Sequence, residues 1–410
     1  MASVLDGIRK EINKKYEKLG YDVVKNPIVQ IGVPTDKFTQ KFSFGTPSLD
    51  FITYNSIPRG IMIEITGDES SGKTTLAFKI AANFIKEESK KPEEERQHIL
   101  FVDAEGTADS EWAMTSAGYD MNSDVVETAY YVGSGQSAED MFDNIADFVK
   151  SGRIGLVIFD SLTSIAPQQV NDESMTKKDM GTLAKVMSDF VRRNTGLFHR
   201  YQCTFIGING TIMNIGGYGN PETTPGGKYW RRACSLRLKT KRGKYFDEEG
   251  NELSNSAESP VGHIVEVALL KTKFCRWDRK LGRTHLNYTR GLDILWDTID
   301  IAKMYNLIEC TGRTYTFVDP DTGEQLTDEN GNVYKVVGEK NVKAFLENHI
   351  DLWRRIYDTV YSKLSVKDAS NAVSYEKMLN VNVEELFGID FSKEEDEKST
   401  ESIEDALNDQ

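Results

Sequence analysis

The fold is decided by residues 61–75, which read Ile-Met-Ile-Glu-Ile-Thr-Gly-Asp-Glu-Ser-Ser-Gly-Lys-Thr-Thr. An apolar run, Ile61–Thr66, leads into a full match to the pattern G-x-x-x-x-G-K-[ST], and a helical stretch, Thr74–Glu88, follows. This strand, loop and helix are the context in which the pattern binds phosphate. The glycines let backbone N–H groups surround phosphate oxygens, and the helix adds its positive end. The sequence therefore predicts a nucleotide site rather than an accidental glycine-rich turn.

The residues of this loop have different expected roles. Lys73 would reach the β- and γ-phosphates, and the Thr74 hydroxyl would bind Mg²⁺. The expected nucleotide-binding residues are Gly67, Asp68, Glu69, Ser70, Ser71, Gly72, Lys73, Thr74 and Thr75.

Acidic residues end two other apolar runs. Asp160 follows one of them and is expected to hold the metal, although an Asp after a strand is also a common turn starter. Glu105 is the expected general base, while Asp103, which ends the second run, either caps a turn or competes for that role. Trp112 lies in an expected short helix, where it either stacks on a nucleotide base or packs in the core.

Strand-like and helical runs alternate over residues 42–273, which predicts an α/β fold with a mainly parallel sheet and helices on both faces. The expected strands are Ile61–Thr66, His98–Asp103, Ile154–Asp160, Thr204–Asn209 and Val261–Lys271, and the expected helices are Thr74–Glu88, Ser137–Val149 and Met180–Leu197.

Four parts are expected along the chain. Residues 1–41 hold a helix and a short strand, 28–33, that are too small to form a core. Residues 42–290 form the α/β core. Residues 291–383 read as a small α+β domain with helices at 292–305 and 341–364 and hairpins at 311–337. Residues 384–410 are expected to be an acidic, disordered tail.

The charge is unevenly distributed along the 410 residues. The chain has 50 basic and 64 acidic residues, a net charge of −14, and −9 of that lies in residues 384–410. Residues 228–244 carry eight bases and no acid, and residues 271–290 carry seven bases and one acid. Beside the glycine-rich stretch 211–227, these bases suit single-stranded nucleic acid or form a plain solvated face. The tail either aids solubility or competes with DNA for the basic stretches.

Several classes of protein are disfavoured. There is no apolar run near 18 residues and no secretory signal, so a membrane protein is not expected. The four cysteines show no C-x-x-C spacing and there are only five histidines, so neither a disulfide framework nor a zinc site is predicted. We expect a cytoplasmic protein, in the host cytoplasm if the chain is phage-encoded.

At this point the motifs resemble those of RecA-type homologous recombinases, including their phage relatives. The resemblance covers roughly residues 10–365, and the Gly-Asn-Pro-Glu-Thr-Thr segment is its most specific part. The segments that carry it are Phe44–Asp50, Gly67–Thr75, Asp103–Glu105, Gly219–Thr224, Lys271–Lys273 and Gly291–Leu307.

The resemblance implies roles for several residues. Glu105 matches the water-activating glutamate, Asp160 the metal-side carboxylate and Trp112 an aromatic on adenine, so ATP and Mg²⁺ are the implied cofactors. Lys271 and Lys273 match a lysine pair that reaches the ATP of a neighbouring subunit, and the N-terminal part resembles a polymerisation element. The first DNA loop falls at Met175–Met180 and the second at Thr211–Pro225, and the expected DNA-binding residues are Lys177, Lys178, Met213, Ile215, Gly216, Gly217, Tyr218, Arg231 and Arg232.

The implied function is a DNA-dependent ATPase that forms a helical filament on single-stranded DNA and exchanges strands with a homologous duplex. Single-strand-binding and loader proteins are further expected partners. The alternatives are a ring-forming hexameric helicase or motor, and a recombination mediator that uses ATP only structurally. One residue departs from the family: Gly210 stands where many relatives have a glutamine that links the γ-phosphate to the second DNA loop. Asn209 is the expected substitute.

Overall fold

The computed structural model describes residues 4–18, 23, 28–29, 41–55, 57–133, 135–168, 182–213, 222–248, 250–254, 256–327, 330–364 and 373–396. The chain divides into two compact units, Met1–Lys41 and Phe42–Gln410. In the first unit the expected helix is present as α1, Val4–Glu17. The Asn13 carboxamide donates to Val29 O at 3.0 Å and accepts from Val29 N at 2.9 Å. Of the strand expected at 28–33, only Ile28 and Val29 lie within the described residues.

The second unit is built around one large sheet. The strands of this unit, in the large sheet and in smaller ones, are β2 Ile57–Pro58, β3 Met62–Gly67, β4 His98–Asp103, β5 Thr128–Val132, β6 Ile154–Asp160, β7 Thr204–Asn209, β8 Ile212–Met213, β9 Glu222–Thr223, β10 Leu236–Phe246, β11 Glu252–Leu253, β12 Gly262–Thr272, β13 Leu281–Asn287, β14 Gly291–Leu292, β15 Ile308–Thr311, β16 Thr314–Phe317 and β17 Lys335–Val337. Strand β1, Lys41–Phe42, consists of the last residue of the first unit and the first residue of the second. The helices are α2 Pro47–Ile52, α3 Lys73–Glu88, η1 Glu93–Glu95, α4 Ser110–Ala117, α5 Ala138–Lys150, η2 Leu162–Ser164, α7 Thr182–Arg200, α8 Gly227–Ala233, α9 Ile294–Met304, α10 Glu339–Asn348, α11 Ile350–Lys363, α12 Tyr375–Leu379, α13 Val383–Phe387 and α14 Phe391–Asp396.

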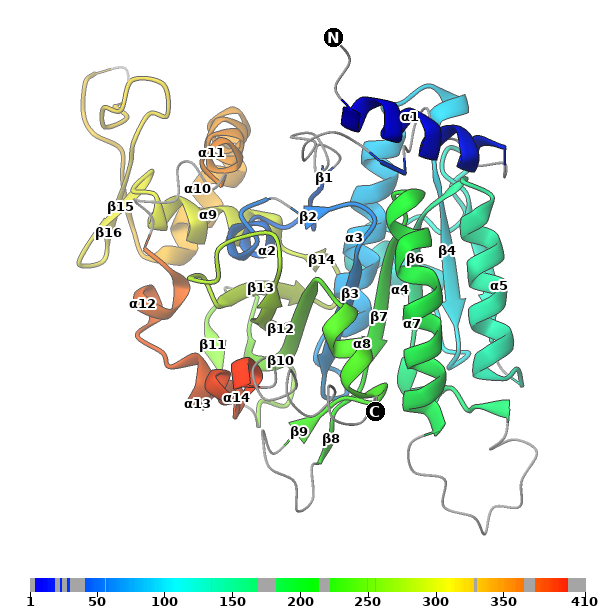
Figure 1. Cartoon of the computed structure of the whole chain (residues 1–410). Helices are drawn as coiled ribbons and strands as arrows, with labels where there is room; N and C mark the ends of the chain where they lie inside the picture. The colour runs from blue at the N-terminus through cyan, green and yellow to red at the C-terminus, as the bar shows by residue number, and fades with distance from the viewer. Residues whose placement is uncertain are drawn as a thin grey trace. The chain divides into compact units, whose positions relative to one another are not determined.

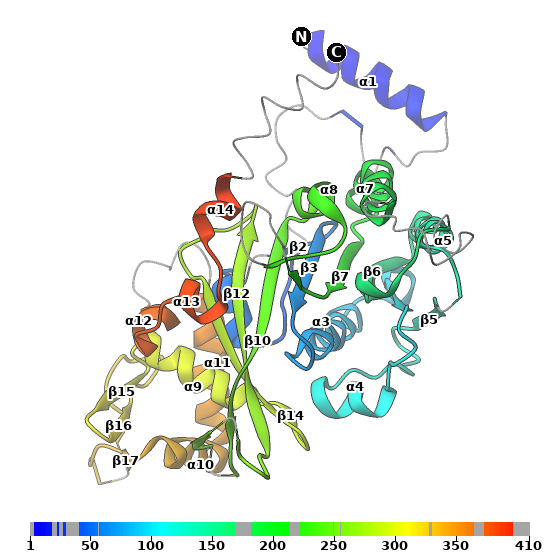
Figure 2. The same cartoon turned by 90° about the horizontal axis from the view of Figure 1, so that it is seen from below.

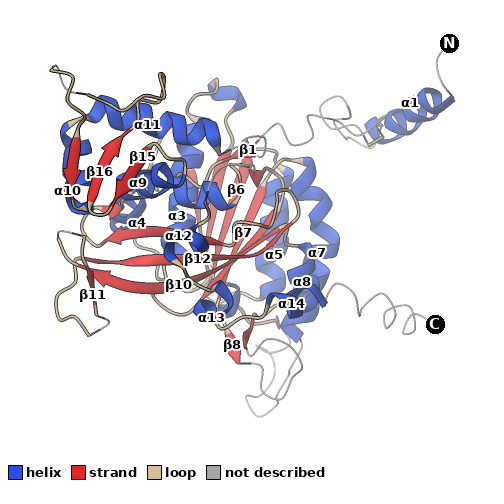
Figure 3. Ribbon diagram, turned by 90° about the vertical axis from the view of Figure 1, so that its left-hand side faces the viewer, coloured by secondary structure: helices blue, strands red, loops and turns tan. Residues whose placement is uncertain are grey.

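The large sheet is mainly parallel, as predicted. Within the described residues its strand order is β14-β13-β12-β10-β3-β7-β6-β4-β5, with β11 paired to β10. The strands from β10 to β5 are parallel to their neighbours, and β10, β12, β13 and β14 are antiparallel. Figure 1 shows the parallel strands between their helices, and Figure 3 shows the twist of the whole sheet. All the parallel strands therefore end at one edge of the sheet.

Alternation along the strands produces a hydrophobic core on each face of the sheet. In β4, Ile99 and Phe101 join the core that contains α3, whereas Leu100 and Val102 join the core that contains α5 and α7. Strands that bury both faces read as unbroken apolar runs. All five expected strands are present, and this burial explains the four that lie in the parallel part of the sheet, β3, β4, β6 and β7; the fifth, expected at Val261–Lys271, is the antiparallel strand β12.

The prediction that the bases of residues 228–244 form a continuous solvated face is wrong. Most of it is β10, an 11-residue strand that pairs with β3 on one side and β12 on the other. Arg237 is 4% exposed and Lys239 is 7% exposed. Both bases are inside because carboxylates lie beside them: Arg237 Nε is 2.6 Å from Glu64 Oε2, and Lys239 Nζ is 2.7 Å from Glu222 Oε2.

The C-terminal residues share a core with the large sheet. Phe317, Val342 and Ile356 belong to the same hydrophobic cluster as the apolar residues of β3. The helix expected at 341–364 is two helices, α10 and α11, which meet at His349. The hairpins contain the antiparallel sheet β15-β16-β17.

The expectation of disorder from residue 384 onward is wrong for residues 384–396. This segment contains most of α13 and all of α14, which Figure 2 shows near β12. Phe387, Ile389 and Phe391 are each at most 8% exposed. Phe387 O accepts a hydrogen bond from Lys239 Nζ at 3.2 Å, and Phe391 lies edge-on to Trp277 at 5.2 Å. Apolar residues among the acids thus fix this segment to the protein.

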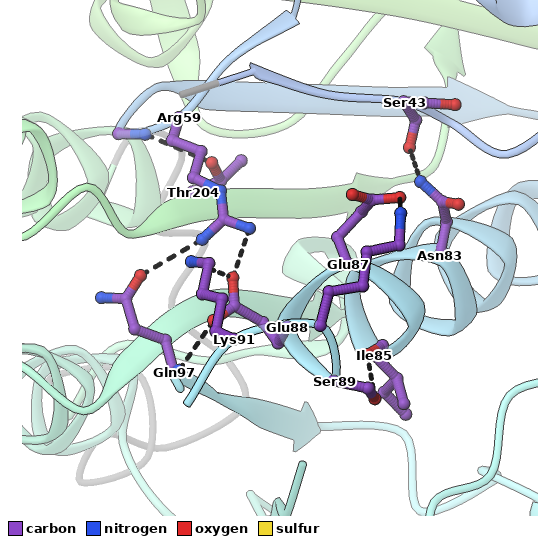
Figure 4. A network of polar contacts seen from close by, with 12 residues as sticks. Ser43, Arg59, Asn83, Ile85, Glu87, Glu88, Ser89, Lys91, Gln97 and Thr204 are labelled. Carbon is purple, nitrogen blue, oxygen red and sulfur yellow. Dashed lines mark hydrogen bonds and ion pairs between the residues drawn. The ribbon is translucent and has the colours of Figure 1, made fainter. Parts of the chain in front are cut away.

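A buried polar network holds the far end of α3 (Figure 4). Arg59 and Glu88 form an ion pair of 2.5 Å with side chains 4% and 0% exposed. Glu88 also accepts from Lys91 Nζ at 2.7 Å and from Gln97 N at 2.9 Å. Because Gln97 directly precedes β4, the network ties the end of α3 to the start of that strand. It therefore fixes the helix whose first residue is Lys73.

Within the described residues, no helix is both long enough and apolar enough to cross a membrane. None of the four cysteines forms a disulfide bond. Cys203 and Cys234 are buried, Cys275 is half-buried and Cys310 is exposed.

Candidate nucleotide and DNA site

The predicted phosphate loop joins β3 to α3 as the motif requires. Gly72 caps α3 with φ +93°, and a Cβ there would lie 3.0 Å from the Val265 side chain. At Gly67, with φ +152°, a Cβ would overlap the carbonyl oxygen of Thr240. The loop turns tightly against β10 and β12, so only glycine fits at these two positions.

Lys73 and Ser71 hold the loop in shape. Lys73 Nζ donates to Gly67 O at 2.9 Å and to Asp68 O at 2.6 Å. Ser71 Oγ donates to Asp68 O at 2.7 Å. Burial lowers the pKa of Lys73, while the nearby carboxylates, Asp160 foremost, act against this shift. The ammonium therefore lies among groups that favour its charge, at the position expected for a phosphate contact.

Asp160 and Thr74 lie together at the carboxyl end of β6, with Thr74 Oγ1 2.8 Å from Asp160 Oδ2. Burial raises the pKa of Asp160 to about 6, and the negative charges of Glu105 and Asp103 add to the shift. A divalent cation would relieve this crowding of carboxylates. A nucleotide-bound Mg²⁺ needs only one or two protein ligands. The Thr74 hydroxyl and the Asp160 carboxylate therefore fit a magnesium ion that is shared with phosphate.

Glu105 lies beside this pair and is held by two hydroxyls. Ser161 Oγ is 2.5 Å and Ser164 Oγ 2.8 Å from Glu105 Oε1. The Glu105 side chain is exposed, which leaves it accessible to water.

Asp103 has a different role. Its carboxylate accepts hydrogen bonds from the Gly106, Thr107 and Ala108 N–H groups at 2.6, 3.3 and 3.0 Å and from the Tyr130 hydroxyl at 2.6 Å. Burial acts to raise the pKa of Asp103, but the Tyr130 and backbone hydrogen bonds outweigh it and lower the pKa. Of the two roles that the sequence left open, Asp103 fills that of the cap.

A cavity of about 430 Å³ adjoins the phosphate loop. Trp112 lines the cavity and also packs against the hydrophobic core, so its position fits both of the roles that the sequence left open. Sequence reasoning missed the other four lining residues, Arg242, His263, Leu286 and Tyr288. His263 Nδ1 lies 3.0 Å from the Tyr288 hydroxyl, and burial lowers the pKa of His263 to about 4. Arg242 belongs to β10, His263 to β12 and Leu286 to β13, and Tyr288 directly follows β13, so no local motif marks these residues.

Lys271 and Lys273 do not lie at the phosphate loop of their own chain. Lys271 pairs in register with Arg237, which pairs with Glu64 near the middle of β3. Lys273 lies farther still from Gly67, about 17 Å along the strands at the usual rise per residue. Their ammonium groups donate to α8: Lys271 Nζ is 2.6 Å from Arg231 O, and Lys273 Nζ is 2.7 Å from Arg232 O.

The expected DNA-binding residues are described only in part. Met213 lies on β8 and is 67% exposed, beside Ile212, which is 46% exposed. Arg231 and Arg232 lie in the last turn of α8. The other expected contacts lie outside the described residues: Lys177, Lys178, Ile215, Gly216, Gly217 and Tyr218.

Comparison with known proteins identifies the family. The family model described as RecA N-terminal domain matches residues 9–292. Protein RecA of Clostridioides difficile is 27% identical over 353 residues, 86% of this chain and 91% of that protein. Protein RecA of Sulfurimonas denitrificans is 28% identical over 350 residues, 84% and 89% of the two chains. Protein RecA of Nitratiruptor sp. is 27% identical over 377 residues, 91% and 97% of the two chains. Because the matched region runs through the whole parallel sheet and covers well over half of the chain, the protein belongs to the RecA family of recombinases.

Proposed function

We propose that this RecA-family recombinase, a DNA-dependent ATPase, binds ATP with Mg²⁺ at the phosphate loop, forms a helical filament on single-stranded DNA and exchanges strands with a homologous duplex. The observation that carries the proposal is the meeting of Lys73, Asp160 and Glu105 at one edge of the sheet. Thr74 is 2.8 Å from Asp160, and the charge of Glu105 acts on both Asp160 and Lys73.

The residues divide the work of hydrolysis. Glu105 takes the proton of the attacking water, with Ser161 and Ser164 fixing its carboxylate. Lys73 stabilises the charge that develops on the phosphate oxygens. Thr74 and Asp160 would hold Mg²⁺, which would supply further charge neutralisation. Trp112 stacks on adenine in the cavity beside the loop.

The position of Lys271 and Lys273 supports an active site shared between subunits. Lys271 lies level with Glu64 near the middle of β3, Lys273 lies farther from the phosphate loop, and both ammonium groups are bonded to α8, so neither contacts the phosphate loop of its own chain. In a filament they would act on the ATP of the neighbouring subunit and neutralise charge in the transition state. Loader and single-strand-binding proteins stay predicted partners.

The test measures ATP hydrolysis with and without single-stranded DNA, then joint-molecule formation. We expect DNA to stimulate hydrolysis and Lys73→Ala to abolish ATP-dependent strand exchange. Full exchange by Lys73→Ala would refute the site. Closed hexamers with duplex unwinding would indicate a helicase instead, and negligible hydrolysis in both conditions would indicate a mediator.

A further inference from the structure

The hairpin β8–β9 forms the described base of the stretch matched to the second DNA loop. Ile212 pairs with Thr223 and Met213 with Glu222. On the incoming side, Asn209, Gly210 and Thr211 join β8 to the carboxyl end of β7, next to the nucleotide site. The contacts of these three residues therefore determine how a change at the phosphate loop is transmitted to the hairpin.

Asn209, the substitute expected for the missing glutamine, is already engaged elsewhere. It is fully buried. Its Nδ2 donates to Glu64 Oε1 at 3.0 Å and to Pro225 O at 3.0 Å, and its Oδ1 accepts from Thr163 Oγ1 at 3.1 Å. Both its amide hydrogens and one acceptor site are therefore used, and the bond to Pro225 O joins the two sides of the hairpin base. Asn209 thus fixes the hairpin base and does not reach the phosphate loop.

Thr211 does reach the phosphate loop. Its Oγ1 donates to Asp68 Oδ1 at 3.0 Å, a bond between residues 143 positions apart in the sequence. Thr211 directly precedes β8, and Asp68 directly follows β3. Because Asp68 is exposed and Thr211 is half-buried, neither side chain is needed to fill the core. The bond joins the nucleotide site to the first residue of the hairpin.

Asp68 is also the residue that Lys73 contacts. Its main-chain oxygen accepts from Lys73 Nζ and Ser71 Oγ, while its carboxylate accepts from Thr211. An ammonium has three donors, so a phosphate that recruits Lys73 competes with the bonds to Gly67 O and Asp68 O. A change at Lys73 therefore alters the support of Asp68 and, through its carboxylate, the position of Thr211.

We infer that Thr211, acting through Asp68, is the positioning residue that couples the nucleotide state of the phosphate loop to the DNA affinity of the β8–β9 hairpin. This inference rests on the proposed function. It assigns to a hydroxyl–carboxylate pair the side-chain link that Gly210 lacks. Gly210 contributes main-chain contacts alone: its carbonyl oxygen accepts from Thr66 Oγ1 at 3.4 Å, and its N–H donates to Thr163 Oγ1 at 2.7 Å. Coupling between two ligands is reciprocal, so the pair also transmits bound DNA to the nucleotide site.

The experiment uses the full chain and a fluorescent single-stranded oligonucleotide. The measured quantity is the ratio of the DNA dissociation constants in ADP and in a non-hydrolysable ATP analogue, at one fixed salt concentration. A general loss of DNA affinity affects both constants equally and cancels in the ratio. Thr211→Val should reduce the ratio about tenfold, the size expected for one hydrogen bond to a charged acceptor.

Three controls make the test specific. Thr211→Ser keeps the hydroxyl and should keep the wild-type ratio. Thr316→Val is the matched control, because it makes the same substitution on β16, outside the phosphate loop and the β8–β9 hairpin. It should leave the ratio unchanged. In an Asp68→Ala background, Thr211→Val should cause no further change, because the pair acts as a unit.

The outcomes separate this inference from the proposed function. A wild-type ratio near one would overturn the proposed function and this inference with it. A wild-type ratio well above one, with an unchanged ratio in Thr211→Val, would overturn the inference alone. Equal losses in Thr211→Ser and Thr211→Val, or an undiminished Thr211→Val effect in the Asp68→Ala background, would also overturn it.

Discussion

A Glu64→Gln substitution should lower the free energy of unfolding by about 3–5 kcal/mol, the usual loss when one partner of a buried ion pair is removed. Glu64 is fully buried in β3, and its carboxylate accepts three hydrogen bonds. The donors are Arg237 Nε at 2.6 Å, Trp230 Nε1 at 2.8 Å and Asn209 Nδ2 at 3.0 Å. Glutamine offers one oxygen instead of two, so one of these buried donors would face an NH₂ group.

The direction of the pKa shift gives the pH dependence of this loss. Burial acts to raise the pKa of Glu64, but the Arg237 charge and the three hydrogen bonds lower it below the ordinary 4.5. A carboxylate with a depressed folded pKa stabilises the fold above its unfolded pKa and loses this contribution as the pH falls through the folded pKa. The difference in stability between wild type and Glu64→Gln should be complete at pH 7 and shrink below pH 4.5.

Urea unfolding followed by tryptophan fluorescence measures the effect, and Trp230 reports from inside the network. The matched control is Glu252→Gln. Glu252 also accepts from two bases, Lys244 and Arg283, but its side chain is 40% exposed. An exposed pair contributes at most about 1 kcal/mol, so this variant should unfold close to wild type. If Glu64→Gln unfolds at the same urea concentration as Glu252→Gln, the reasoning about the buried pair is wrong.

Three other predictions concern stability and the tail. Arg59→Met should cost about 3 kcal/mol in urea unfolding, because Glu88 would keep only Lys91 as a charged partner; a change below 1 kcal/mol would contradict this. Burial raises the pKa of Asp50 to about 6, so from pH 7 to pH 5 the wild type should gain about 1 kcal/mol relative to Asp50→Asn, and a constant difference would refute the assignment. If the acidic tail competes with DNA, truncation of the chain after Asp396 should raise its affinity for duplex DNA, and unchanged binding in a titration would refute this idea. Truncation before Glu384 is unsuitable, because it would also delete side chains that are buried in the core.

The sequence predicted β3, β4, β6 and β7 because their burial on both faces leaves unbroken apolar runs. It did not predict the parallel strand β5, whose residues are half-buried or exposed. It did not predict β10, whose inward residues include Arg237 and Lys239. These two bases are tolerated inside only because Glu64 and Glu222 lie opposite. Glu64 is 173 residues from Arg237, so no window of sequence contains both partners. The charge pattern of the sequence therefore predicted a solvated basic face that includes two bases which are in fact buried.

The candidate site divides in the same way. Residues 67–75 and the acids that end β4 and β6 could be predicted, because the chemistry of a phosphate loop prescribes residue types at fixed places. The wall formed by Arg242, His263 and Tyr288 could not, because antiparallel strands from the second half of the fold bring it to the loop. Thr211 could not be predicted for a further reason: the role inferred for it depends on Asp68, which occupies one of the unspecified positions of the motif.

Glu64 connects the two regions that the proposed function requires to respond to ATP. Asn209 joins it to the base of the β8–β9 hairpin, and Trp230 joins it to α8. The last carbonyl groups of that helix accept from Lys271 and Lys273, the residues proposed to act on the neighbouring subunit. One buried carboxylate thus supports both the β8–β9 hairpin and the helix that anchors Lys271 and Lys273. In the absence of urea, where the variant is still folded, Glu64→Gln should weaken DNA binding and filament formation together. Thr211→Val, in contrast, should alter only the dependence of DNA binding on nucleotide.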